Sequence, residues 1–87
     1  MNDYIAEKLK EIIQSRFKLD FSRVKDEDYD TSFFNPVFGF SASDMLYLFF
    51  DVEKAFGIKI PEADIEADAF SSFNSITGVI ERQLKHK

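Results

Sequence analysis

The sequence contains no cysteine, no tryptophan and a single histidine, His86, which stands beside the terminal Lys87. The lack of cysteine excludes disulfides and thiolate metal sites. A catalytic histidine needs neighbours in fixed geometry, and a place so close to the end of the chain does not favour them. The phosphate-binding patterns GxxxxGK[ST] and GxGxxG are also missing. These absences predict a protein that is not an enzyme, with no catalytic residue and no bound metal.

Long apolar runs are missing too. No stretch approaches the roughly 20 consecutive apolar residues that a membrane-spanning helix needs. The first residues, Met1 to Ile5, are neither basic nor followed by the apolar run of a signal peptide. We therefore expect a cytoplasmic protein without membrane contact. Its 87 residues predict a single domain, 1–87. We expect this domain to be a monomer.

Positive charge is scarce in the middle of the chain. Residues 26–68 hold eleven Asp or Glu against only Lys54 and Lys59, whereas segments 1–25 and 69–87 are each slightly basic. Nucleic acid is not an expected partner, because neutralising phosphates requires clustered Lys and Arg. The acidic middle favours a protein partner with a basic docking surface, although the same charge would also serve solubility alone.

The acidic run Asp26-Glu27-Asp28-Tyr29-Asp30 has the alternating aspartates that begin a calcium-binding loop. Such a loop requires Gly at its sixth position and a bidentate Glu at its twelfth, where this chain has Thr31 and Val37. We therefore expect a solvated charge run rather than a metal site.

Helical periodicity predicts a first helix from Asn2 or Asp3 to about Phe17. Residues 18–40 show no sustained period and contain Asn35-Pro36, so they predict a long ordered loop. Hydrophobic side chains are expected to hold this loop on the core, namely Leu19, Phe21, Val24, Phe33, Phe34, Val37 and Phe38.

A second helix is predicted from about Ala42 to Phe56, with Ser41 as its N-cap, Asp44 three residues on, and Gly57 as its stop. Its core stripe is expected to consist of Leu46, Phe49, Val52 or Glu53, and Phe56, flanked by Met45 and Leu48. The opposite side is expected to present Tyr47, Phe50, Asp51 and Lys54. In an alternative arrangement, one of the two rings folds back onto Phe38 or Phe40.

Two further helices complete the prediction. Residues 62–68 predict a short third helix, with Pro61 favouring its start. The last helix is expected to begin near Ser72 or Asn74 and to direct Phe73, Ile76, Ile80 and Leu84 inward. Gly78 lies inside it and weakens it by about 1 kcal/mol relative to Ala, which suggests a packing reason for this glycine.

The segment from Gly39 to Leu46, together with Phe56-Gly57-Ile58-Lys59-Ile60-Pro61, resembles the attachment region of acyl carrier proteins. In that family a Gly-x-Asp-Ser-Leu motif opens the second helix, and the Ser oxygen carries a 4′-phosphopantetheine arm. The stretch Phe70-Ser71-Ser72-Phe73-x-x-Ile76 is similar to the family's entry into its fourth helix. The resemblance implies an all-α, acyl-carrier-type antiparallel four-helix bundle, with a long loop between helices 1 and 2 and a short third helix.

The resemblance places the family's Asp and Ser on Ser41 and Ala42. A methyl group cannot be phosphopantetheinylated, so the chain as written is expected to have no cofactor. What is implied is a carrier-like docking or accessory protein for an enzyme of fatty acid or polyketide biosynthesis or of peptide maturation. The alternative is an acyl or peptidyl carrier whose 4′-phosphopantetheine site is natively Ser at position 42 or is displaced to Ser41 or Ser43.

The candidate cofactor-binding residues are thus Ala42, Ser41 and Ser43. Ser41 is expected to serve as a helix cap, and Ser43 lies one helical step, about 100°, away from the family's position. In the family the outward side of the second helix docks partner enzymes. The resemblance therefore makes four residues candidates for partner binding, namely Asp44, Tyr47, Phe50 and Asp51.

Overall fold

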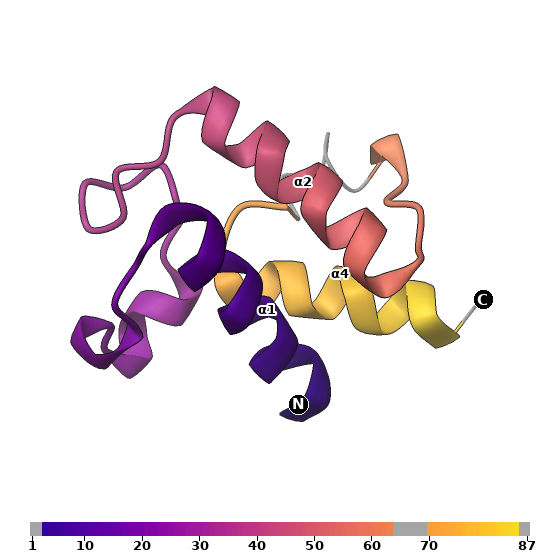
Figure 1. Ribbon diagram of the computed structural model, residues 1–87, viewed down its shortest axis with the longest axis horizontal. Helices are drawn as coiled ribbons and strands as arrows, with labels where there is room; N and C mark the ends of the chain where they lie inside the picture. Colours follow the sequence, from indigo (N-terminus) through magenta and orange to yellow (C-terminus); the bar gives the residue numbers. More distant parts are fainter. Residues whose placement is uncertain (1–2, 64–69, 86–87) are drawn as a thin grey trace.

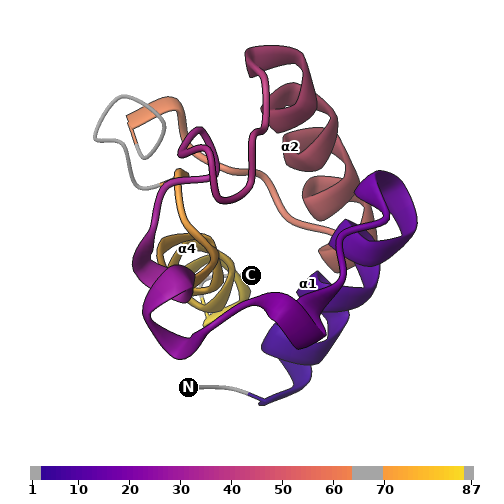
Figure 2. The same cartoon turned by 90° about the vertical axis from the view of Figure 1, so that its left-hand side faces the viewer.

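The computed structural model describes residues 3–63 and 70–85, which form three α-helices and two short 3-10 helices and contain no strand. The α-helices are α1 (Asp3–Phe17), α2 (Ala42–Phe56) and α4 (Phe73–Lys85), and they surround one core (Figure 1, Figure 2). The 3-10 helices, η1 (Phe21–Arg23) and η2 (Asp26–Asp30), lie in the long segment between α1 and α2. The all-α prediction is confirmed.

The predicted third helix falls largely outside the described residues. Glu62 and Ala63 are helical, and residues 64–68 of the predicted span are not among those described. The described part of the chain therefore establishes a three-helix arrangement.

α1 has the bounds predicted from its apolar periodicity. Ile5, Leu9 and Ile13 recur every four residues and are fully buried. The helix ends where Lys18 adopts a left-handed conformation (φ 57°) and its N–H donates to the carbonyl of Gln14 at 2.9 Å. This is the usual backbone stop of a helix, here made by a lysine rather than by the glycine that fits it without strain.

α2 begins and ends as predicted. The Ser41 hydroxyl oxygen accepts the N–H of Asp44 at 3.1 Å, and the Asp44 carboxylate accepts the N–H of Ser41 at 2.9 Å. This reciprocal capping box satisfies two N–H groups that the helix itself cannot pair. At the other end Gly57 has φ 64°, and its N–H donates to the carbonyl of Glu53.

The predicted core stripe of α2 is partly wrong. The buried residues are Met45, Leu48, Val52 and Phe56. Leu46 is 54 % exposed, and Phe49 is only partly buried. Residues 45–50 of α2 are all apolar or aromatic, so two neighbouring stripes both have helical spacing. Periodicity alone cannot choose between them, and contact with α1 and the loop decides.

The segment between α1 and α2 is held by Phe33, which is fully buried. The ring of Phe33 stacks on Phe40 and meets Phe38 edge-on, with both centroid distances at 4.9 Å. The Phe33 N–H also donates to the carbonyl of Ser71 at 2.8 Å, which ties the loop to the entry of α4. Two of the predicted anchors do not pack, because Phe34 and Val37 are more than half exposed.

α4 places Phe73, Ile76 and Ile80 in the core as predicted, with Leu84 partly buried. The packing reason suggested for Gly78 is wrong. Gly78 is exposed, and a Cβ placed on it would meet no atom of the described residues within 4 Å. Close approach of another described element thus does not explain a glycine at this position.

The corrected phase of α2 predicts unequal effects for its two neighbouring leucines. Leu48→Ala should lower the free energy of unfolding by about 2–5 kcal/mol, because it removes a fully buried side chain and leaves a cavity. Leu46→Ala is the matched control and should change it by less than about 0.5 kcal/mol. Urea denaturation of both variants measures the difference. Equal losses would mean that α2 is rotated from the orientation seen here.

Candidate functional site

The start of α2 presents Ser41, Ala42 and Ser43, all of them exposed. Ala42 is the first residue of the helix, and its side chain offers no oxygen. The Ser41 hydroxyl is the acceptor of the capping box, so the prediction that Ser41 serves as the N-cap is confirmed. Ser43 follows on the first turn. Ala42 stands at the family's attachment position but has no hydroxyl group. Ser41 and Ser43 have hydroxyl groups but flank that position.

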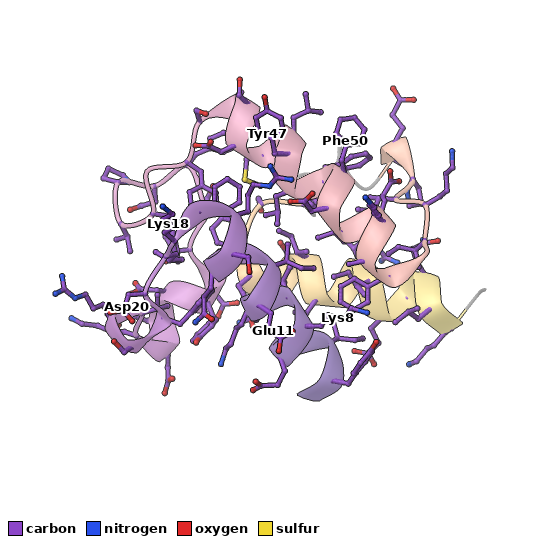
Figure 3. All side chains as sticks on the ribbon, viewed as in Figure 1. Lys8, Glu11, Lys18, Asp20, Tyr47 and Phe50 are labelled. Carbon is purple, nitrogen blue, oxygen red and sulfur yellow. The ribbon has the colours of Figure 1, made fainter. Side chains whose placement is uncertain are left out.

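Tyr47 and Phe50 project outward from α2 (Figure 3) and are 53 % and 56 % exposed. The alternative in which one of them folds back over the loop is wrong. Phe40 instead packs against Phe17 of α1, with ring centroids 4.5 Å apart. Together with exposed Leu46, Tyr47 and Phe50 give α2 an apolar outer face.

Asp51 is held by Arg16 from the last turn of α1. The Arg16 Nε and Nη2 atoms donate to the two carboxylate oxygens of Asp51 at 2.6 and 2.8 Å. These hydrogen bonds, together with the positive charges of Arg16 and Lys54, lower the pKa of the Asp51 carboxyl below its ordinary value, although partial burial opposes the shift. The guanidinium also lies 5.5 Å from the centre of the Tyr47 ring.

Two of the four candidate partner-binding residues are therefore engaged within the protein. Asp51 is paired with Arg16, and Asp44 is partly buried in the capping box. Tyr47 and Phe50 keep half of their surface exposed. The outer face of α2 is thus less acidic than its sequence suggests, and its accessible part is mainly apolar.

Arg16 is the residue that the sequence prediction missed. It stands in the last turn of α1, where an arginine is ordinary because it complements the helix dipole. Nothing in the sequence says that α1 and α2 meet at this turn. A bidentate partner for Asp51 could be found only once the two helices were placed side by side.

The acidic run at residues 26–30 forms η2. The Asp28 carboxylate accepts the N–H of Lys25 at 3.0 Å, and the Asp30 carboxylate accepts the Nδ2 of Asn74 at 2.9 Å. Across residues 3–63 and 70–85, no three His, Cys, Asp or Glu side chains gather closely enough to hold a metal ion. None of the helices described has the length and apolarity needed to cross a membrane.

Comparison with known proteins gives no relative for this chain. No protein-family model matches it, and no curated protein or solved structure matches it either. Functional inference therefore starts from the residues and contacts described above.

The Arg16–Asp51 pair predicts a pH response that can be measured at one carboxyl group. The pKa of Asp51 is lowered in the folded state. The pair therefore contributes stability at pH values above the ordinary Asp pKa of about 3.9. That contribution is lost as the pH falls through the lowered value. Arg16→Met should raise the Asp51 pKa, as followed by the NMR signal of its carboxyl carbon. Arg23→Met is the matched control and should leave it unchanged. A wild-type midpoint at the ordinary value would contradict the pairing in solution.

Proposed function

We propose that the chain is an acyl-carrier-like four-helix domain without an attachment serine, which acts as a docking or accessory protein for a biosynthetic or peptide-modification enzyme. The observation that carries the proposal is the start of α2. Ala42 is exposed at the first helical position, directly after the capping residue, where the sequence resemblance puts the phosphopantetheine serine.

The residues present do not fit a phosphopantetheine arm. The arm needs an oxygen nucleophile, and Ala42 ends in a methyl group. Attaching the arm to Ser41 would disturb the capping box, which stabilises the helix by roughly 1 kcal/mol. Ser43 points about 100° away from the attachment direction. These properties of Ser41, Ala42 and Ser43 are consistent with a role that depends on protein contact rather than on a carried group.

The docking surface proposed is the outer face of α2. Tyr47 and Phe50 lie one helical turn apart and supply an exposed aromatic pair of the kind that anchors protein interfaces. The partner is expected to carry a basic surface that meets the acidic segment 26–68.

The absence of a nucleophile predicts that the protein stays unmodified in cells that phosphopantetheinylate ordinary carriers. Intact mass measurement after coexpression with a phosphopantetheinyl transferase tests this. Ser41→Asp with Ala42→Ser restores the Asp and Ser of the family's motif and keeps a good helix cap, so this double variant should gain the mass of the arm. An adduct mapped to wild-type Ser41 or Ser43 would instead make the chain a carrier. A double variant that stays unmodified would count against the resemblance itself.

The aromatic pair predicts where a partner enzyme binds. A photo-crosslinking residue at position 50 should capture the enzyme in the source cells. The control carries the same photo-crosslinking residue in place of Lys59, which is exposed. With the captured enzyme in hand, Tyr47→Ala with Phe50→Ala should accelerate its dissociation, because two desolvated anchors are lost. The melting temperature of the free domain should stay nearly constant, since both rings are half exposed. Unchanged binding by the double variant would exclude this face.

A further inference from the structure

A groove of about 730 Å³ lies between α1 and α2. Among the described residues, those that line it all come from these two helices, so α4 takes no part in it. Ile12 and Ala55 belong to its lining and are partly buried against the core. The two helices run in opposite directions here, because Arg16 near the end of α1 meets Asp51 while Lys8 near its start lies over the ring of Phe56.

The charge of this groove is opposite in sign to that of the whole chain. Three cations line it, Lys8, Arg16 and Lys54, together with two carboxylates, Glu11 and Asp51. Arg16 and Asp51 compensate each other through two hydrogen bonds. The remaining charge is therefore positive, within a protein whose net charge is −5.

The two lysines differ in how they are held. Lys8 is positioned by both helices, since its ammonium donates to the Tyr4 hydroxyl of α1 at 3.1 Å and lies 5.2 Å from the centre of the Phe56 ring of α2. Lys54 is exposed and has no salt bridge within the part of the chain that the structure describes. One cation is thus fixed at the wall of the groove and the other can turn toward a ligand.

The shape of the groove suits a helix. From Lys8 to Arg16 its α1 wall spans about 12 Å, or roughly two helical turns. Figure 3 shows Lys8 and Glu11 on the α1 side and the exposed rings of Tyr47 and Phe50 along α2. Tyr47 adjoins the groove through its contact with Arg16, which lines it. Ile12 and the small side chain of Ala55 form the floor of the groove. A helix from another protein could pack a row of apolar side chains on this floor.

We propose that this groove binds an amphipathic helix of the partner protein whose carboxylates face Lys8 and Lys54 and whose apolar side chains rest on Ile12 and Ala55. Charge complementarity selects this occupant, because an acidic helix is attracted to the lysines of this groove although the net charge of the chain is −5. The inference rests on the proposed docking function and names a second contact beside the exposed rings of α2.

The experiment uses the full-length ¹⁵N-labelled chain and two synthetic probes. One probe is an amphipathic helical peptide of about 18 residues, long enough to be helical in isolation, built from leucine, alanine and glutamate. The other has lysine in place of every glutamate. The glutamate peptide should shift the amide signals of Lys8, Ile12, Asp51 and Ala55, and added salt should weaken its binding. The lysine peptide should leave these signals in place.

Charge reversal provides the matched test. Lys8→Glu with Lys54→Glu should weaken binding of the glutamate peptide about tenfold or more, as loss of two favourable contacts and gain of two repulsions require. Lys18→Glu with Lys59→Glu changes the net charge equally at two exposed positions outside the groove and should change binding less than about twofold. Melting curves check that both variants fold.

Four results would overturn the proposal. These are equal binding of the lysine peptide, equal loss in the two double variants, amide shifts confined to another face, and the absence of any shift at millimolar peptide. Groove shifts that depend on protein concentration without peptide would assign the groove to a second copy instead. A phosphopantetheine adduct would overturn the proposed function while leaving the peptide result intact, so the two failures can be told apart.

Discussion

The burial of Phe33 is the constraint on which the rest of the structure depends. This residue lies in the middle of the long segment between α1 and α2, yet it is fully buried. Its N–H donates to Ser71 and its carbonyl accepts the N–H of Phe40, so it joins the entry of α4 to the residue that precedes the cap of α2. Its ring stacks on Phe40, which in turn packs on Phe17 at the end of α1. Through its backbone and its ring, Phe33 thus connects the three described α-helices together with Phe40.

This connection fixes where α2 begins. Phe40 is held from one side by Phe33 and from the other by Phe17, and Ser41 follows immediately as the cap. Burying aromatic rings of this size offsets the entropy cost of ordering a long loop. The position of Ala42 is therefore set by the core and the cap together. Ala42 is thereby exposed at a position that packed rings and a capping box hold on both sides.

Much of the fold could be predicted from the sequence, for identifiable local reasons. The bounds of α1 and α2 followed from apolar spacing, from the Ser41 and Asp44 capping box, and from Gly57 as a stop residue. The phase of α2 could not be predicted, because Leu46 and Leu48 both belong to acceptable apolar stripes and only packing separates them. The loop anchors were predicted as a class, but hydrophobicity alone does not reveal that Phe33 is buried while Phe34 is exposed.

The candidate site shows the same division between local and long-range information. Tyr47 and Phe50 are exposed as predicted, because they lie outside both apolar stripes that the spacing of α2 allows. The charge of the surface around them could not, because the carboxylate of Asp51 is compensated by Arg16, a residue 35 positions away in the chain.

Charge counted along the sequence therefore overstates the acidity of α2, and the surface beside it is positive where Lys8 and Lys54 line the groove. A partner that met only the average charge of this protein would have to be basic. A partner that enters between α1 and α2 meets a positive local field instead, because screening confines each contact to charges within about 10 Å of it. Local charge and shape, rather than the net charge of −5, thus determine what can bind beside the exposed rings of α2.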